Sequence, residues 1–398
     1  MSALATALVR LGDEVTGADR NLATANIAFL ESIGVRCFPD DGSGVDAATD
    51  EVIVSTAIEA DNPGLVKAKA LGLRVVHRAA ALSNALSGRR LVAVVGTCGK
   101  STVTAMLGHI LAECGLDPLC VNGANVPGWE GAVRFGRGEY AVAEVDESDR
   151  SLVAFNPYAA VVTNASADHY SKEEMDEVFD AFAARCTGPV IDGRRPSGDA
   201  PEEVETSLLG VHNRRNAALA LRMALALGCD EVRARAALIS FGGVERRLQR
   251  IRPSTGADAP AVYDDYAHNP EKLRALWTTL AERYGRVCAV WRPHGYGPLR
   301  KMTEAFAEMF AAVVRPGDAL LLLPVYDAGG TADRTVNSDA LRDAVARIAG
   351  DRVRVELVGD LDAAAAWVAA HRDFDAYAIC GARDPGLPGL ARRVAELG

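Results

Sequence analysis

Short apolar runs alternate with longer amphipathic stretches along most of the chain. The longer stretches, such as residues 101–115 and 214–228, carry apolar residues at helical spacing. Strands that are covered by helices on both faces appear as continuous apolar runs, because neither face meets water. The pattern therefore predicts an α/β fold with parallel sheets. The expected strands lie at residues 51–56, 90–96, 159–164, 286–291, 319–325 and 375–381.

The order of these elements divides the chain into three blocks. The 398 residues suffice for two or three domains at roughly 100–200 residues each. Arg89 and Arg90 precede a new strand, and the pair Gly242-Gly243 precedes the last block. We expect a loop or hairpin at 252–262 that enters a strand. The predicted domains are residues 1–89, 90–245 and 246–398.

Composition narrows the classes of function. Charged residues make up 24% of the chain and the net charge is −10, so there is no electrostatic reason to expect nucleic acid or an anionic membrane as a partner. No apolar run reaches the ~18 residues that span a bilayer, and the N-terminus does not read as a signal peptide. The eight cysteines are scattered without a CxxC pair. These features predict a cytoplasmic protein with reduced thiols and no zinc site.

The sharpest local signal is the segment VVGTCGKST at residues 94–102. It lies between an expected strand and an expected helix, where glycines let backbone N–H groups converge on phosphate oxygens. Lys100 can reach the terminal phosphates of ATP, and the Ser101 hydroxyl can bind Mg²⁺. Val94 stands where the longer motif has glycine, so the alternative is an ordinary turn with a surface lysine. The predicted phosphate-binding residues are Gly96, Thr97, Gly99, Lys100, Ser101 and Thr102.

Acidic residues and a histidine follow two further strands. Glu144 ends the run EYAVAEV, at the carboxyl edge of a sheet where ligands bind in open α/β folds. The following acidic residues 146–149 are either part of a site or an exposed loop. His169 follows the strand at 159–164 and is either a metal ligand with Glu144 or a structural histidine. Oxygen ligands together with ATP phosphates suit Mg²⁺.

Eight segments occur together in the order found in one known family. The chain resembles the Mur ligases, and within them the branch that adds L-alanine, or a recycled peptide, to UDP-N-acetylmuramate. These segments extend over nearly the whole chain and are GTCGKST, AEVDESD, TNASADH, GVHNRRNAALA, GGVERRLQ, YDDYAHNP, RPHGYG and GARDPG.

The resemblance implies a fold and a reaction. The fold would have a Rossmann-like UDP-sugar-binding domain, a central P-loop ATPase-type domain with a parallel sheet, and a Rossmann-like C-terminal ligase domain. The enzyme would activate a carboxylate with ATP as an acyl phosphate and join it to an amino acid or peptide, releasing ADP and phosphate. Its partners would be these small molecules, with ATP and Mg²⁺ as cofactors, and the protein would be a monomer or homodimer.

The resemblance also implies roles for single residues. Lys100, Glu144 and His169 would be catalytic, and Ser101, Glu144 and His169 would bind the metal. His212, Asn213 and Asn216 would surround the adenine; the alternative is a helix cap and helix start, with Asn213 as a residue that can do both. The remaining ATP contacts would be Arg247, Asp265 at the ribose, and His268.

The chain departs from the family at several positions. The family's first strand and glycine-rich turn have no counterpart before Met1, which predicts either an upstream start or altered sugar binding. Cys98 and Asn269 replace histidines, only 43 positions separate His169 from His212, and the run after Pro293 lacks the family's arginine pattern. The residues 326–330 could also line the amine pocket. The predicted substrate contacts are Asp19, Ser55, Thr56, Ser148, His294 and Arg300. The alternatives are an ordinary turn residue at Asp19 and glycine-rich surface turns at 293–300 and 326–330.

Two alternatives to this function remain open. The first is a Mur-like ligase of a specialised pathway that uses a different acid. The second is a nucleotide-binding protein that has lost ligase activity.

Overall fold

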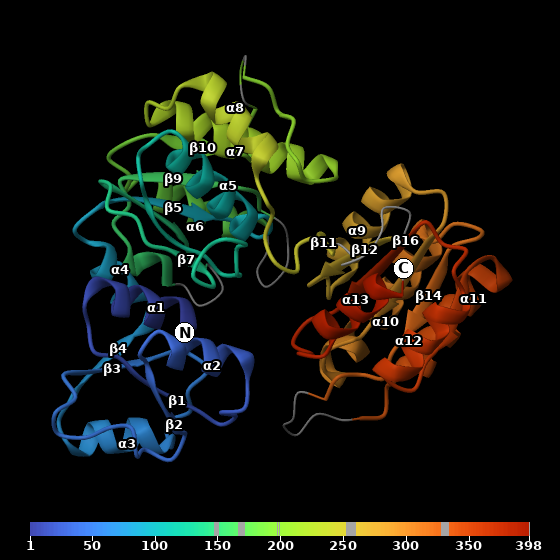
Figure 1. The fold of residues 1–398 in the computed structure, drawn as a ribbon, viewed down its shortest axis with the longest axis horizontal. Coiled ribbons are helices and arrows are strands. Elements are labelled where there is room, and N and C mark those ends of the chain that lie inside the picture. The colour runs from blue at the N-terminus through green and yellow to red at the C-terminus, as the bar shows by residue number, and fades with distance from the viewer. Residues whose placement is uncertain are drawn as a thin grey trace. The chain divides into compact units, whose positions relative to one another are not determined.

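The structure is a computed structural model that describes residues 1–146, 151–165, 172–196, 198, 200–251, 260–327 and 334–397 (Figure 1). Its contacts divide the chain into two compact units. Unit 1 comprises Met1–Ser207 and Asn213–Gly243, and unit 2 comprises Leu208–His212 and Val244–Gly398. Among the described residues, no helix combines the length and apolar character needed to cross a membrane.

The first part of unit 1 contains two small parallel sheets, each of two strands. Two of its helices begin at polar caps: Thr24 accepts a hydrogen bond from the Ile27 N–H, and Asn62 accepts one from the Leu65 N–H. The strands are β1 (Thr16–Asp19) with β2 (Arg36–Pro39), and β3 (Glu51–Val54) with β4 (Arg74–His77). The helices are α1 (Ser2–Leu11), α2 (Ala25–Ser32), α3 (Pro63–Ala70) and α4 (Arg78–Leu86).

The second part of unit 1 is a six-stranded sheet in the order β10-β9-β5-β8-β6-β7, parallel except for β7. Strand β5 lies between β8 and β9, and its residues from Leu91 to Val95 are buried, as its unbroken apolar run predicts. The strands are β5 (Arg90–Val95), β6 (Leu119–Val121), β7 (Val133–Arg134), β8 (Tyr140–Glu144), β9 (Ala159–Val162) and β10 (Val190–Asp192). The helices are α5 (Lys100–Glu113), α6 (Lys172–Ala183), α7 (Val211–Ala226) and α8 (Glu231–Ser240), with a short 3-10 helix at Ser151–Ala154.

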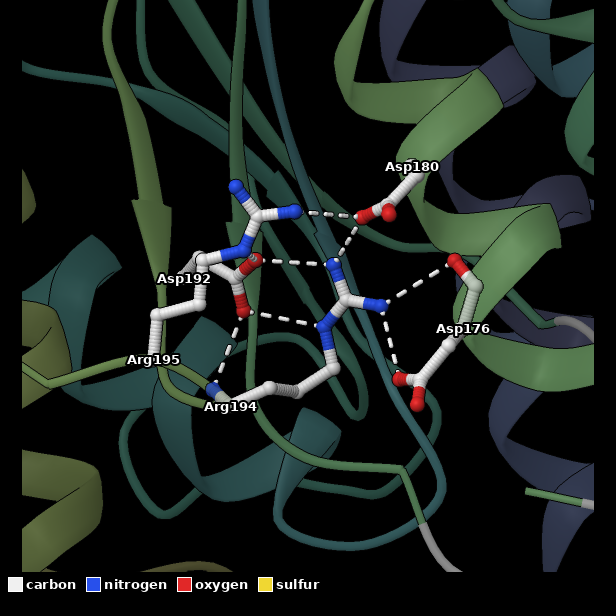
Figure 2. Close-up of polar contacts among 5 residues, drawn as sticks. All are labelled: Asp176, Asp180, Asp192, Arg194 and Arg195. Carbon is white, nitrogen blue, oxygen red and sulfur yellow. Dashed lines mark hydrogen bonds and ion pairs between the residues drawn. The ribbon is translucent and has the colours of Figure 1, made fainter. Parts of the chain in front are cut away.

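The edge strand β10 is joined to α6 by a cluster of charged side chains around Arg194 (Figure 2). The Arg194 guanidinium is only 10% exposed and bonds Asp176 at 2.9 Å, Asp180 at 2.6 Å and Asp192 at 2.7 Å. Although burial opposes its ionisation, the bonds from Arg194 lower the pKa of Asp192. In the described part of residues 169–212, β10 is the only strand, in line with the short spacing noted in the sequence.

Unit 2 is built on a second six-stranded sheet, in the order β11-β12-β16-β13-β14-β15. Strand β11 runs antiparallel to β12, as expected for a hairpin, and the other pairs are parallel. The strands are β11 (Gln249–Ile251), β12 (Ala261–Asp265), β13 (Val287–Trp291), β14 (Ala319–Leu322), β15 (Arg354–Leu357) and β16 (Ala376–Cys380). The helices are α9 (Pro270–Arg283), α10 (Tyr296–Val313), α11 (Ser338–Ala349), α12 (Leu361–Ala370) and α13 (Leu387–Glu396), with a 3-10 turn at Gly350–Arg352.

Successive residues of the unit 2 strands feed two separate hydrophobic clusters, one on each face of the sheet. Trp291 packs with Trp277 and Phe310 in one cluster, whereas Val290 packs with Leu390 in the other. Helices therefore cover both faces (Figure 1). The α/β fold with parallel sheets is confirmed, and the boundaries at residues 89 and 245 stay predictions.

Candidate active site

The turn from β5 to α5, which we call the phosphate loop (residues 96–99), has a backbone that only glycine fits at two positions. Gly96 and Gly99 have φ values of 126° and 84°. A Cβ on Gly96 would lie 2.1 Å from the Thr163 Oγ1, and one on Gly99 would lie 2.6 Å from the Asn216 Oδ1. Both conformation and space therefore require glycine here.

Two side chains at the end of β9 hold this loop. The Asn164 Oδ1 accepts a hydrogen bond from the Cys98 N–H at 2.9 Å, and its Nδ2 donates to the Cys98 carbonyl at 2.9 Å. The Thr163 hydroxyl donates to the same carbonyl at 2.6 Å. Sequence reasoning assigned no role to Thr163 or Asn164, although they are the last two residues of the strand predicted at 159–164; the observed strand β9 ends at Val162, just before them.

Helix α5 begins at Lys100, whose Nζ donates to the Gly96 carbonyl at 2.6 Å. The N-cap, Gly99, contributes no side-chain cap, so the helix start presents backbone N–H groups and a positive dipole end, the arrangement that binds anions. Ser101 and Thr102 are each 6% exposed. The loop therefore has the geometry for a polyphosphate, with the Lys100 ammonium ready to exchange its carbonyl partner for a phosphate oxygen.

Helix α7 brings two buried amides to unit 1. Asn213 and Asn216 are 4% and 8% exposed, and the Asn216 Nδ2 donates to the Asn213 Oδ1 at 3.4 Å. Asn216 is the residue that closes the space beside Gly99. The helix begins at Val211, so the interpretation of Asn213 as a helix cap is wrong: it lies within the first turn. His212 precedes it, in the segment assigned to unit 2.

Glu144 ends β8, next to β5, with Val94 as its partner in register. The Gly123 N–H donates to the Glu144 Oε2 at 2.8 Å. Asp146 forms an ion pair with Arg78 at 3.4 Å, so it belongs to an ionic contact and not simply to an acidic loop. The predicted site residues Ser148 and His169 lie outside the described residues.

A magnesium ion fits the donors that remain. In the described part of the chain, no three His, Cys, Asp or Glu side chains gather into a metal-binding group. The Ser101 hydroxyl and the Glu144 carboxylate are oxygen donors, which Mg²⁺ prefers, and Mg²⁺ normally takes only one or two protein ligands beside phosphates and water. The donor chemistry therefore suits Mg²⁺ bound with a nucleotide.

In unit 2, Asp265 holds a strained turn. Its Oδ2 accepts a hydrogen bond from the Leu248 N–H at 2.6 Å, and its Oδ1 accepts one from the Ala267 N–H at 2.7 Å. Burial raises the pKa of Asp265 to about 6. Arg246 and Leu248 have left-handed backbones, with φ of 57° and 47°. Both oxygens of the predicted ribose ligand thus already serve the backbone on either side.

His268 and His294 lie against each other, with ring centroids 5.1 Å apart at 89°. The Tyr266 carbonyl lies 2.9 Å from the His268 Nδ1. Desolvation, with the charge of Lys272, lowers the pKa of His268 to about 4. Desolvation also lowers the pKa of His294. Both rings are therefore neutral near pH 7.

The other predicted residues of unit 2 have different surroundings. Asn269 caps α9: its Oδ1 accepts a hydrogen bond from the Lys272 N–H at 2.9 Å, and Pro270 is the first helical residue. Arg247 lies over the Tyr266 ring at 5.3 Å. Arg300 is exposed on α10, where it lines a groove of about 600 Å³ between α10 and α11. Arg300 is thus placed on a helix surface, whereas His294 faces His268.

The predicted sugar-nucleotide contacts lie at strand ends. Asp19 ends β1 and accepts a hydrogen bond from the Asn21 N–H at 2.9 Å. Ser55 and Thr56 follow β3 directly. Their positions suit ligand contacts at the carboxyl edge of parallel strands, and their roles stay predictions.

Comparison with known proteins gives matches over the whole chain. The model described as Mur ligase family, catalytic domain, matches residues 1–90, and the model described as Mur ligase, glutamate ligase domain, matches residues 246–383. A UDP-N-acetylmuramate–L-alanine ligase of Burkholderia ambifaria is 32% identical over 94% of this chain and 91% of its own. The structure of UDP-N-acetylmuramate–alanine ligase from Thermotoga maritima superposes with a TM-score of 0.81 at 22% identity, over 100% of this chain and 96% of that one. A murein peptide ligase from Psychrobacter arcticus gives 0.62 at 20% identity, with the same coverage.

Proposed function

Because the chain belongs to the Mur ligase family and is an ATP-dependent ligase, we propose that it joins UDP-N-acetylmuramate, or a related carboxylate, to L-alanine, a similar amino acid or a peptide. The observation that carries this proposal is the phosphate loop, with its two obligatory glycines and with Lys100 at the helix start. The substrates in the names of its relatives support this choice of acid and amine.

The chemistry proceeds in two steps. A carboxylate oxygen attacks the γ-phosphorus of ATP, the bond from that phosphorus to the bridging oxygen breaks, and ADP leaves. The product is an acyl phosphate, whose leaving group is phosphate instead of oxide. The nitrogen of a neutral amine then attacks the acyl carbon, the C–O bond to phosphate breaks, and the amine nitrogen loses a proton.

In this proposal the loop residues supply fixed positive charge. Lys100 leaves the Gly96 carbonyl and neutralises charge on the transferring phosphoryl oxygens. Asn164 and Thr163 are proposed to keep the loop backbone in place during this exchange, because both bond the backbone of Cys98. Ser101 and Glu144 would hold Mg²⁺, which supplies further charge neutralisation when bound.

His294 of unit 2 is proposed to serve the amine, whereas its neighbour His268 is proposed as an ATP contact. Neutral His268 and His294 rings can accept hydrogen bonds or a proton, which protonated rings cannot. His294 is the proposed contact of the incoming amine because it lies in this pair, and Arg300, exposed on α10, is a second proposed substrate contact. Asp265 and Arg247 stay the proposed ATP contacts of this unit.

The proposal is tested by offering the purified protein ATP, UDP-N-acetylmuramate and a panel of amines, and by measuring phosphate release. We expect phosphate only when acid and amine are both present, with L-alanine or a peptide among the active amines. Phosphate release only when UDP-N-acetylmuramate is replaced by a different acid, with an amine still present, would assign the chain to the specialised pathway. ATP binding without release for any pair would leave a nucleotide-binding protein, and the absence of ATP binding would overturn the proposal.

A further inference from the structure

The turn that follows β6 places a backbone amide against Glu144. Strands β6 and β8 are parallel neighbours, with Val121 opposite Ala143 in register, so the next residue of each strand lies at the same carboxyl edge. The Gly123 N–H then donates to the Glu144 Oε2 at 2.8 Å. The donor comes from the backbone, and its place depends on the turn and not on a rotamer.

Residue 123 must be small because the carboxylate lies directly over its Cα. A Cβ at this position would lie 2.5 Å from the Glu144 Oε2, 2.7 Å from its Cδ and 2.8 Å from its Oε1. Gly123 is not among the glycines with positive φ, so its backbone is open to any residue. The requirement for glycine is thus one of space for a single carboxylate.

Asn122 stiffens the turn. Its side chain is 3% exposed, and its Nδ2 donates to the Ala124 carbonyl at 3.1 Å. Its backbone N–H donates to the Ala132 carbonyl at 2.9 Å. These bonds fix both sides of Gly123, and hence the direction of its N–H.

We propose that Gly123 is a positioning residue that fixes the Glu144 carboxylate for metal binding. Its amide donates to Oε2 and so holds the carboxylate in one orientation, in which Glu144 would meet the metal. This inference rests on the proposed function, since it takes Glu144 as the residue that holds Mg²⁺. The Asn-Gly pair reads as an ordinary turn in the sequence, and only the fold brings it to Glu144.

The test is Gly123→Ala. The atoms that a methyl group would meet form the end of a flexible side chain, so the carboxylate moves aside and the fold persists. We expect the affinity for Mn²⁺, measured by electron paramagnetic resonance with a non-hydrolysable ATP analogue bound, to fall about 10-fold, as for other residues that orient a metal ligand. The melting temperature should stay within about 2 °C of the parent. Gly88→Ala is the matched control, because its Cβ would meet nothing within 4 Å.

Two further variants separate this inference from the proposed function. Glu144→Gln alone should weaken Mn²⁺ binding at least as much, and Gly123→Ala should add nothing further in the Glu144→Gln background. Unchanged Mn²⁺ affinity in Gly123→Ala, beside a loss in Glu144→Gln, would overturn the positioning role and leave the function standing. Unchanged affinity in Glu144→Gln would overturn the metal role of Glu144 and, with it, the positioning role of Gly123, whereas phosphate release still tests the ligase function.

Discussion

The phosphate loop of unit 1 and the Arg246–Leu248 turn of unit 2 both contain left-handed backbone, but they use different residues for it. Each is a tight, partly left-handed stretch of backbone held by side chains at the end of a strand: Asn164 and Thr163 for the loop, and Asp265 for the turn. The loop has glycine at its two positive-φ positions, whereas the turn has an arginine and a leucine.

The difference has energetic consequences. At Gly96 and Gly99 the neighbours lie so close that any Cβ would collide. At Arg246 and Leu248 the side chains are present, and each left-handed residue costs about 1 kcal/mol or more. Arg246 offsets this strain by bonding the Asp264 carboxylate at 3.2 Å and the Gly381 carbonyl at 2.6 Å. A side chain added at Gly96 or Gly99 should therefore damage the loop. Loss of the bonds made by the Arg246 side chain should damage the turn.

The largest expected effect is that of Lys100→Ala. Loss of the ammonium removes charge that balances the transferring phosphoryl group, and we expect ligase turnover to fall by about 10³-fold or more. The melting temperature should change little, since Lys100 lies at the start of α5 and its Nζ donates to the Gly96 carbonyl within the same turn. Lys301→Ala, at an exposed position on α10, is the control. Normal turnover in the Lys100 variant would remove the loop from the mechanism.

Gly99→Ala comes next in size. The methyl group would meet Asn216 and would also demand a φ of 84° from an alanine, so we expect ATP affinity to fall about 10-fold or more and stability by about 1–3 kcal/mol. Gly228→Ala separates the two causes, because Gly228 has φ of 91° and open space around its Cα. That control should lose about 1 kcal/mol and keep its ATP affinity. Calorimetry and thermal melts measure both; equal ATP affinity in the two variants would contradict the steric argument.

A smaller effect is the pH dependence of the unfolding free energy. It arises in unit 2 because Asp265 and His268 can titrate, whereas Asn164, which holds the loop of unit 1, cannot. The His268 pKa is about 4 in the fold and about 6.5 unfolded, so the unfolded chain binds more protons in this window and stability rises with pH. The Asp265 pKa is about 6 in the fold and about 3.9 unfolded, so the folded chain binds more protons and stability falls with pH. The two slopes oppose each other between about pH 4 and 6.

His268→Gln should therefore expose the Asp265 slope. We expect the unfolding free energy of the parent to be nearly level from pH 4 to 6, and that of the variant to fall by about 1–2 kcal/mol as pH rises. Urea unfolding at several pH values measures this. A variant whose stability rises with pH would show that Asp265 does not bind its proton more tightly in the fold.

The smallest expected effect is a gain in stability from Arg383→Gly. Arg383 is exposed with φ of 64°, so glycine relieves strain and its greater freedom in the unfolded chain offsets part of the gain. We expect a net stabilisation of about 0.5 kcal/mol in denaturant unfolding. The substitution also removes a charge that helps lower the His294 pKa, so that pKa should rise in an NMR titration. A destabilised variant would show that the arginine side chain contributes more than its backbone strain costs.

The sequence predicted features that follow from a repeating apolar pattern or from a few neighbouring residues. Unbroken apolar runs predicted the buried strands β5, β9 and β13, and the glycines before Lys-Ser predicted the turn between β5 and α5. The helix-cap interpretation of Asn213 failed because α7 begins two residues earlier. Asn164, Gly123 and the backbone bonds of Asp265 carried no local signal of their roles, since those roles depend on which strands become neighbours. The left-handed backbone at Arg246 and Leu248 could not be predicted for the same reason, because long-range bonds, not residue type, impose this conformation.

The Arg194 cluster has a consequence for the association of this protein with other molecules. A sheet that stops at a short outer strand offers unpaired backbone groups that could recruit a strand from another molecule. Here the outer strand β10 has three residues and ends at Asp192. Arg194 and Arg195 follow it, and Asp176 and Asp180 of α6 lie beside them. An incoming strand would have to bury these charges. The same side chains that join α6 to the sheet thus discourage aggregation at the point where the sheet ends.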